Sequence, residues 1–145
     1  MTEIRPLDPA CFQEARVLLE DAALPVADLR PAALPAFFAA WDEGRLAGVV
    51  AVEPLGREGL LRSLAVRPES RGRGTGRRLV AAAEAHARER GIQVLYLLTT
   101  TAEGFFARAG YRRLSRTEAP ASVRGTAEFR TVCPATATLM GKRVG

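Results

Sequence analysis

The chain has 145 residues, 48% of them apolar and 26% charged, and this balance is typical of one folded globular domain over residues 1–145. Two cysteines and one histidine exclude a disulfide framework, structural zinc and a His-rich metal site, so we expect no metal. The formal net charge is +5, and the densest basic cluster comprises Arg67, Arg71, Arg73, Arg77 and Arg78.

The sequence also argues against membrane and nucleic-acid partners. It has no apolar run of the roughly 20 residues that cross a bilayer. The first five residues lack the apolar core of a signal peptide, so a cytoplasmic location is the expectation. The basic cluster has no interleaved aromatic side chains on which bases could stack, which argues against nucleic acid.

The N-terminal part of the sequence predicts a strand, a helix and a loop. Residues 2–7 have a short strand pattern, and Asp8 with Pro9 forms a helix start, an N-cap followed by proline. Residues 24–31 break the helix with two prolines, and a short second helix is expected near residues 32–34. This loop either lines a substrate pocket or is a plain connector. The apolar positions of the first helix, expected to face the core, are Cys11, Ala15, Leu18, Leu19 and Ala22.

An antiparallel meander is predicted for the middle of the chain. Residues 37–41 and 45–53 flank a Gly-containing turn and are expected to form a hairpin. A further turn leads into a strand that ends at Val66.

The region after Val66 predicts a parallel crossover. An alanine-rich helix over residues 75–90 ends at Gly91, with His86 solvated on its flank. Residues 92–98 form a dense apolar run typical of a buried strand, so the strands on either side of the helix should be parallel neighbours. The apolar face of the helix consists of Leu79, Val80, Ala83 and Ala87.

The C-terminal part predicts smaller elements. Three threonines, 99–101, precede a helix over residues 102–109, which Gly110 terminates before a strand that starts at Tyr111. Residues 122–129 predict a loop with a short helix, and residues 131–140 predict a last strand.

The turn between Val66 and the alanine-rich helix predicts a pyrophosphate cradle. A strand, a glycine-rich turn and a helix start bring unpaired amides and positive charge together. Glycines allow the backbone to approach a phosphate closely, and arginines add fixed charge. The spacing matches neither a Walker loop, which needs Gly-Lys-Ser/Thr, nor a Rossmann fingerprint.

This stretch resembles the acetyl-CoA signature of the GNAT acyltransferases, Arg/Gln-x-x-Gly-x-Gly/Ala, which Arg71, Gly74 and Gly76 satisfy after Val66-x-Pro68. The order of predicted elements resembles the GNAT fold over nearly the whole chain. The resemblance implies an α/β (α+β) single domain with a mixed sheet of six to seven strands, flanking helices and two splayed parallel strands. It also implies acetyl-CoA as co-substrate. The pantetheine would pair near Leu64, Ala65 and Val66, and the pyrophosphate would bind the amides of Arg71, Gly72, Arg73, Gly74, Thr75 and Gly76.

A second segment, residues 102–111, resembles the family's Ala-x-x-Phe-Tyr-x-x-x-Gly-Phe run, with one departure. Phe106 stands where many members have the tyrosine that protonates the departing thiolate, and it would contact the cofactor. A hydroxyl could come instead from the threonines 99–101 or from Tyr111, or the thiolate could leave unassisted.

The resemblance implies direct transfer of the acetyl group to a small-molecule amine, and the sequence leaves the base open among several carboxylates. Glu103 and Glu128 are catalytic candidates together with Thr100, while Glu53 and Glu58 remain alternatives. Cys133 is the one candidate for a covalent route, with no histidine placed to activate it. The expected acceptor contacts are Arg62, Thr99, Thr100, Glu128 and Cys133.

A narrower resemblance points to the arsenic-resistance-associated branch of the family. It rests on residues 60–63, 97–102 and 119–120, the Thr126-x-Glu128-Phe129 run and Cys133-Pro134. The branch implies an amine-bearing acceptor that includes arsenicals. The alternative is a degenerate member that binds acyl-CoA as a sensor or interaction module. Family members often dimerise through late strands, and residues 131–140 are the segment that could serve a homodimer.

Overall fold

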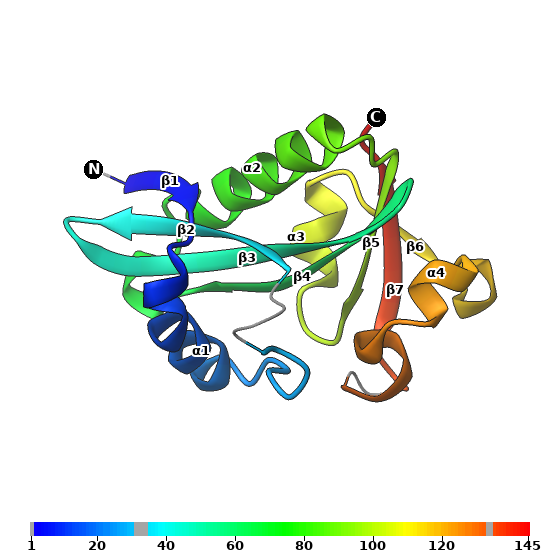
Figure 1. Ribbon diagram of the computed structural model, residues 1–145, viewed down its shortest axis with the longest axis horizontal. Helices are drawn as coiled ribbons and strands as arrows, with labels where there is room; N and C mark the ends of the chain where they lie inside the picture. Colours follow the sequence, from blue (N-terminus) through cyan, green and yellow to red (C-terminus); the bar gives the residue numbers. More distant parts are fainter. Residues whose placement is uncertain (1, 31–34, 133–134) are drawn as a thin grey trace.

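A mixed sheet of seven strands runs through the molecule, in the order β1-β2-β3-β4-β5-β7-β6. The computed structural model describes residues 2–30, 35–132 and 135–145. The sheet and its flanking helices agree with the fold expected from the sequence (Figure 1). The strands are β1 (Thr2–Pro6), β2 (Ala36–Asp42), β3 (Arg45–Leu55), β4 (Glu58–Val66), β5 (Val94–Thr99), β6 (Arg112–Leu114) and β7 (Thr138–Arg143).

Helices cover both faces of this sheet. They are α1 (Phe12–Asp21), α2 (Thr75–Glu89), α3 (Glu103–Arg108) and α4 (Ala121–Arg124). Short 3-10 turns occupy Pro9–Cys11, Pro68–Ser70 and Arg116–Glu118, and a π-helical turn occupies Glu128–Val132. Within the described ranges, no helix has the length and apolar character needed to cross a membrane.

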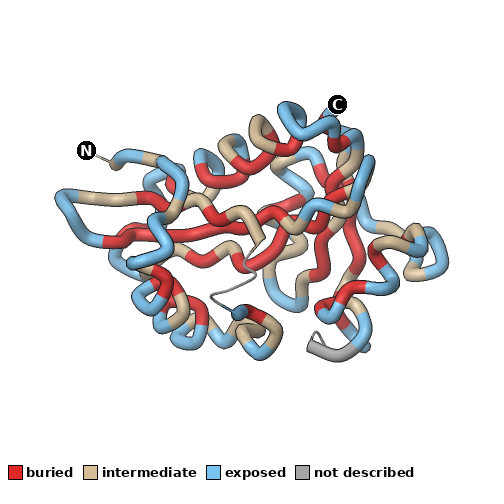
Figure 2. Tube along the Cα trace, in the orientation of Figure 1, coloured by how far each residue is buried: buried red, intermediate tan, exposed pale blue. Residues whose placement is uncertain are grey.

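The apolar faces of the helices generate separate cores on the two sides of the sheet. On one side α2 and α3 pack on the inner strands, and the four predicted apolar residues of α2 are all buried there. On the other side α1 covers β2 to β4, and α4 covers β5 and β7. Figure 2 shows buried positions running along the central strands and along the inward faces of α1 and α2. The core layers therefore hold β4 and β5 from both sides.

The strands β4 and β5 pair for only a short distance before they separate. Their parallel register joins Glu58–Leu60 to Val94–Tyr96. A bulge follows in β4, because Ser63 and Leu64 together stand opposite Val50 of β3. Ser63 is buried and has a left-handed φ of 58°, a conformation that costs a non-glycine residue about 1–3 kcal/mol. The predicted splay is thus built on a local irregularity of β4.

The C-terminal strand differs from the sequence prediction. Instead of residues 131–140, β7 covers Thr138–Arg143, because a helical turn precedes it. In this turn the Arg130 amide donates to the Thr126 carbonyl at 3.0 Å. One edge of β7 is paired along its length by β5, and residues 139–141 of the other edge are paired by β6.

Two smaller expectations are also corrected. His86 is not solvated but half-buried, because its ring packs edge-to-face on Phe38 at 5.2 Å between centroids. In α1 the core positions are taken by Phe12, Ala15, Leu18 and Leu19, while Cys11 and Ala22 are only partly buried. The short helix expected near residues 32–34 lies outside the described residues.

A buried polar cluster joins α2 to the C-terminal strands. The Tyr111 hydroxyl donates to Glu84 Oε2 at 2.9 Å, and Lys142 Nζ donates to Glu84 Oε1 and Oε2 at 3.1 and 3.0 Å. Lys142 also donates to the Ala109 carbonyl at 2.9 Å, at the end of α3. Burial raises the pKa of Tyr111, and the charge of Glu84 and the hydrogen bond to it act in the same direction. The cluster satisfies the buried carboxylate of Glu84 on α2.

We predict that Glu84→Gln lowers the free energy of unfolding by about 1–3 kcal/mol, because it leaves the partly buried ammonium of Lys142 without its carboxylate. Glu89→Gln, on the exposed end of the same helix, is the matched control and should change stability by less than about 0.5 kcal/mol. Urea unfolding of both variants measures the difference. Equal free energies of unfolding for the two variants would show that the Glu84 cluster makes no specific contribution to stability.

Candidate functional site

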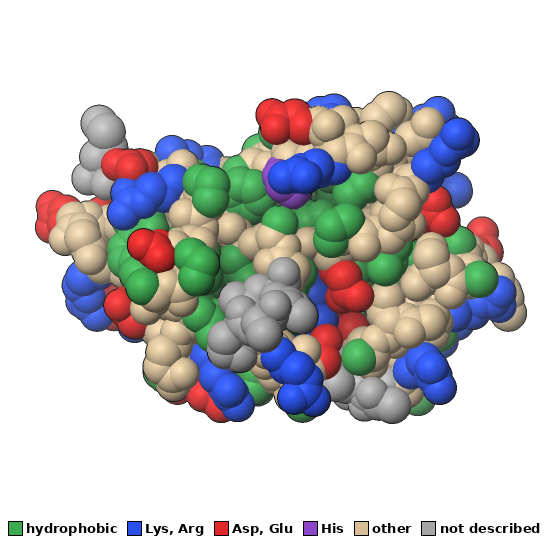
Figure 3. Space-filling view, viewed as in Figure 1, with side chains coloured by type: hydrophobic (Ala, Val, Ile, Leu, Met, Phe, Trp, Pro, Cys, Tyr) green, Lys and Arg blue, Asp and Glu red, His purple; other side chains and the backbone are tan. Residues whose placement is uncertain are grey.

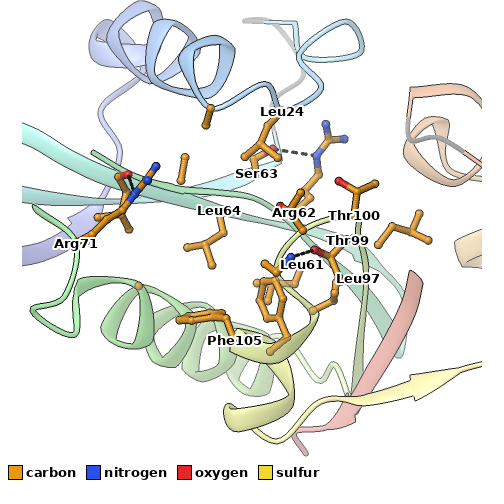
Figure 4. A pocket seen from close by; sticks show the side chains of 18 of the residues that line it. Leu24, Leu61, Arg62, Ser63, Leu64, Arg71, Leu97, Thr99, Thr100 and Phe105 are labelled. Atoms are coloured by element: carbon orange, nitrogen blue, oxygen red, sulfur yellow. Dashed lines mark hydrogen bonds between the residues drawn. The ribbon is translucent and has the colours of Figure 1, made fainter. Parts of the chain in front are cut away.

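A cavity of about 1000 Å³ opens where β4 and β5 separate. The end of β4 and the start of α2, with α3 beside it, line one end of the cavity, and the far end of β5 lines the other. Figure 4 shows Arg62, Ser63 and Leu64 of β4 along one wall, with Leu97, Thr99 and Phe105 on the facing side. The cavity therefore lies directly on the irregularity of β4.

The N-terminus of α2 forms the basic end of the cavity. Gly74 is the N-cap in the left-handed region, with φ of 79°, and no side chain caps the helix. The amides that begin the helix are left without intrahelical partners and carry partial positive charge. A Cβ on Gly74 would meet nothing within 4 Å, so the turn has room for a ligand. These features fit the pyrophosphate cradle that the sequence predicts.

Gly76 serves a different purpose, because it allows α2 to pack closely on α3. A Cβ at this position would lie 3.3 Å from the ring of Phe105 and 3.8 Å from Val66. A methyl group here would require the Phe105 ring to shift by a few tenths of an ångström.

The arginines of the cradle divide into two groups. Arg71, Arg77 and Arg108 line the cavity, and Arg71 Nε donates to the Val66 carbonyl at 3.0 Å. Arg73 does not line it; its side chain is 64% exposed and pairs with Asp42 at 3.5 Å. The prediction for Arg73 concerns its backbone amide and stays a prediction. The sequence analysis did not foresee Arg108, which reaches the cavity because α3 packs beside α2. The other predicted cofactor residues that line the cavity are Leu64, Ala65, Val66, Gly72, Gly74, Thr75, Gly76 and Phe106.

Apolar side chains form the middle of the cavity. Phe106 is buried there and stacks edge-on with Phe105 and Tyr111, at 5.1 and 5.7 Å between ring centroids. Tyr111 itself does not line the cavity, since its hydroxyl faces Glu84. This geometry places the Tyr111 hydroxyl outside the cavity, so the threonines and an unassisted departure of the thiolate remain as alternatives. Thr99, Thr100 and Thr101 all line the cavity, and Thr99 Oγ1 also accepts from the Ala102 amide at 3.0 Å.

Arg62 dominates the far end of the cavity, with a side chain only 1% exposed. Its Nη1 and Nη2 both donate to the carboxylate of Asp28, the latter at 2.8 Å. Nη1 also lies 3.4 Å from Glu53, and Nε lies 2.8 Å from Glu128 Oε2. Nε is in addition 3.2 Å from the hydroxyl of Ser63, the residue at the β4 bulge. Four separate segments therefore meet on one guanidinium.

The charges of this cluster stabilise one another. The hydrogen bond from Arg62 lowers the pKa of Asp28, although burial acts in the opposite direction. Burial alone would lower the pKa of Arg62, but the hydrogen bond to Asp28 and the charges of Glu128, Asp28 and Glu53 raise it. The guanidinium and the Asp28 carboxylate therefore both remain charged at neutral pH.

The structure shows which of the carboxylates considered as the general base lie at the cavity and which do not. Glu128 lines the cavity and is 4% exposed. Glu103 does not line it; its side chain is 44% exposed and lies 3.8 Å from Arg113. Glu53 reaches the site only beside Arg62, and Glu58 accepts a hydrogen bond from Ser122 at 3.2 Å. Cys133 lies outside the described residues.

The contact between Asp28 and Arg62 was not foreseen from the sequence. Asp28 lies in the loop after α1, and only the fold reveals that it meets a β4 residue. The same loop brings Leu24 and Pro25 to the cavity, in agreement with the pocket-lining alternative for residues 24–31. In the sequence, an aspartate between two prolines indicates a loop. It does not indicate which residue the aspartate contacts.

Comparison with known proteins gives a consistent result. The model of the acetyltransferase (GNAT) family matches residues 1–115. Over 71 residues the chain is 37% identical to an amino-acid acetyltransferase of Ralstonia nicotianae, a stretch that covers 48% of this chain and 16% of that protein. Over 63 residues it is 41% identical to an uncharacterised N-acetyltransferase of Chlorobaculum tepidum, covering 43% of this chain and 40% of the relative. The chain thus spans less than half of either relative.

Solved structures share the fold. N-acetylglutamate synthase from Neisseria gonorrhoeae, complexed with coenzyme A and L-arginine, superposes with a TM-score of 0.83 at 24% identity, over 98% of this chain and 33% of that one. Rv2747 from Mycobacterium tuberculosis, in complex with CoA, superposes with a TM-score of 0.81 at 22% identity, over 97% and 98% of the two chains. With the family model spanning most of the sequence and the fold in agreement, the chain belongs to the acetyltransferase (GNAT) family.

Proposed function

We propose that this protein transfers the acetyl group of acetyl-CoA directly to the amine of a small molecule. The observation that carries the proposal is the single cavity that connects the amide cradle of α2, through the gap between β4 and β5, to the charged cluster at Arg62. Family membership supports it, and two structural neighbours are described with coenzyme A bound.

The cradle residues are assigned to the co-substrate. The amides at the start of α2 bind the pyrophosphate, and Arg71, Arg77 and Arg108 add positive charge along the same wall. The pantetheine arm lies in the gap beside Leu64, Ala65 and Val66. Phe106 contributes an apolar wall at the thioester end.

The reaction needs a neutral amine nitrogen that attacks the thioester carbonyl carbon. A C–N bond forms, the C–S bond breaks, and the amine loses a proton while the thiolate gains one. Glu128 is assigned to accept the amine proton, because among the described residues it is the carboxylate that lines the cavity. Thr100 is assigned to the thiolate side in place of the tyrosine that Phe106 replaces. The absence of a phenolic acid predicts slow turnover, since a general acid typically contributes about 10²–10⁴-fold.

Arg62, Thr99, Thr100 and Glu128 are assigned to the acceptor. The sequence resemblance to the arsenic-resistance-associated branch places amine-bearing arsenicals, and toxic amines generally, among the acceptors to be tested. Cys133 is also assigned to the acceptor, on the basis of the sequence alone. A homodimer and a cytoplasmic location complete the proposal.

A sensor that binds acyl-CoA without turnover is the second candidate, and the apolar Phe106 in the acid position favours it. The two functions are separated by calorimetry with acetyl-CoA and by thiol release with a panel of amines and amino-arsenicals. Binding with acceptor-dependent thiol release supports the transferase, and binding without release on any acceptor supports the sensor. No binding would contradict both.

We predict that Gly74→Ala weakens acetyl-CoA binding about tenfold, because a Cβ at φ of 79° costs about 1–2 kcal/mol and shifts the N-cap. Gly44→Ala is the matched control. Gly44 has φ of 80° in the turn between β2 and β3, and its added Cβ also meets nothing within 4 Å. Both variants should lose similar stability, but only Gly74→Ala should change the calorimetric Kd. An equal Kd for the two would remove the helix start from the binding site.

We predict that Glu128→Gln lowers kcat/KM by about 10²-fold, while the Kd for acetyl-CoA stays unchanged. Glu103→Gln should alter kcat/KM by less than twofold, because Glu103 lies outside the cavity. Steady-state thiol release with the best acceptor measures both. If Glu103→Gln gave the larger loss, the assignment of the two carboxylates would have to be reversed.

A further inference from the structure

We propose that Arg77 and Arg108 form a second anion site at the exposed edge of the cavity, and that this site recognises the 3′-phosphate of coenzyme A. The inference rests on the proposed transferase function and deepens it, because it states which form of the acyl donor the chain accepts. It follows from three arginines that line the cavity, from the packing of α3 on α2 and from the phosphate groups of the donor.

Three arginine side chains line the cradle end of the cavity without a carboxylate partner. They are Arg71, Arg77 and Arg108, and none of them forms an ion pair within the described part of the chain. By contrast, Arg73 of the same turn does not line the cavity and is paired with Asp42 at 3.5 Å. Figure 3 shows the ordinary arrangement on one face of the molecule, where basic side chains lie scattered around the rim with acidic ones among them. The cradle end therefore carries positive charge that described carboxylates do not compensate.

Backbone carbonyls orient two of these side chains but use little of their hydrogen-bonding capacity. Arg71 Nε donates to the Val66 carbonyl at 3.0 Å, and Arg77 Nη2 donates to the Arg108 carbonyl at 3.5 Å. The Arg108 side chain runs back along α3, since its Nη1 lies 3.6 Å from the position that a Cβ on Gly104 would take. A guanidinium has five N–H donors, so most of the donors of these arginines are available to an anion.

Arg77 and Arg108 are brought together by the packing of two helices. Arg77 lies in the first turn of α2, and Arg108 is the last residue of α3. The close approach of Phe105 to Gly76 fixes these two turns against each other. Both arginine side chains are exposed, whereas Phe106 in the middle of the cavity is buried. The pair therefore lies beside the cradle, at the solvent side of the cavity.

The donor assigned to this cavity carries two separate phosphate groups. Its pyrophosphate continues into the pantetheine arm and is assigned to the amides of α2 and to Arg71. A phosphomonoester on the 3′ oxygen of the ribose carries a further charge of about −1.5 to −2 at pH 7. The ribose follows the pyrophosphate on the side away from the pantetheine, so its phosphate would lie toward solvent, where Arg77 and Arg108 are exposed. Arginine binds phosphate through charge-assisted and often bidentate hydrogen bonds, which suits this pair to a phosphomonoester.

Coenzyme A and dephospho-coenzyme A differ only by the 3′-phosphate, so their relative affinity tests the inference. Calorimetry on the full chain gives the Kd of each. We expect coenzyme A to bind at least about tenfold tighter. Thiol release from acetyl-coenzyme A and acetyl-dephospho-coenzyme A, with the same acceptor, should differ in KM for the donor but agree in kcat, because the 3′-phosphate is remote from the reacting thioester.

Variants of the cavity arginines report on the cause. Arg77→Gln and Arg108→Gln should each lower the preference for coenzyme A about three- to tenfold, and the double variant should bring the two Kd values close together. Arg71→Gln should weaken both ligands alike and change the ratio by less than about twofold, because both ligands contain the pyrophosphate. Arg90→Gln removes an exposed positive charge at the far end of α2, outside the cavity, and should change neither Kd.

Equal affinities of the unsubstituted protein for the two ligands would overturn the inference and leave the transferase function intact, since the donor would still bind. An unchanged ratio in the double variant would also overturn it, and would show that Arg77 and Arg108 are surface charges only. Failure of both ligands to bind would contradict the transferase function and the inference together. The expected ratio without thiol release on any acceptor would support the inference and favour the sensor over the transferase.

Discussion

The separation of β4 from β5 is the constraint on which the site depends. Parallel pairing lasts only from Glu58 to Leu60, and the bulge at Ser63 then turns β4 away. Both faces of the sheet are covered by helices, so the gap opens inside the molecule and becomes a cavity lined by backbone as well as side chains. A left-handed φ at a buried serine stores local strain at the point where acetyl transfer is proposed.

Arg62 connects this strand to its neighbour β3 and to two segments that are distant in the sequence. Its partners come from the loop after α1, from β3 and from the turn before β7. Burying a guanidinium is costly, and ion pairs repay that cost only when their geometry is good and their remaining hydrogen bonds are satisfied. Asp28, Glu128 and Ser63 supply those bonds. The cluster therefore fixes the position of the loop and of the turn more than it adds net stability, and together they form the acceptor end of the cavity.

The sequence predicted the fold and the glycine-rich turn before α2 well because their signals are local. Glycines at 72, 74 and 76 before an alanine-rich helix, and a Gly91 stop, define the crossover without knowledge of distant contacts. The acceptor end was harder, because its partners are far apart in the chain: Arg62 meets Asp28 across 34 residues. The choice between Glu103 and Glu128 likewise depended on which side of α3 faces the cavity. The extent of β7 was misjudged because residues 131–140 have strand-like composition, whereas a helical turn that includes Glu128 precedes the strand.

The insertion of β7 between β5 and β6 has a consequence for the order of folding. β6 has β7 as its sheet neighbour, yet β7 follows every other strand along the chain. The meander from β1 to β4 can form as soon as those residues leave the ribosome, since its strands pair with sequence neighbours. The second half of the sheet must wait for residues 138–143, and pairings over long sequence separations form slowly. A chain under synthesis would therefore carry an exposed edge on β5 until its last strand arrived, and that interval is when the protein is most exposed to aggregation.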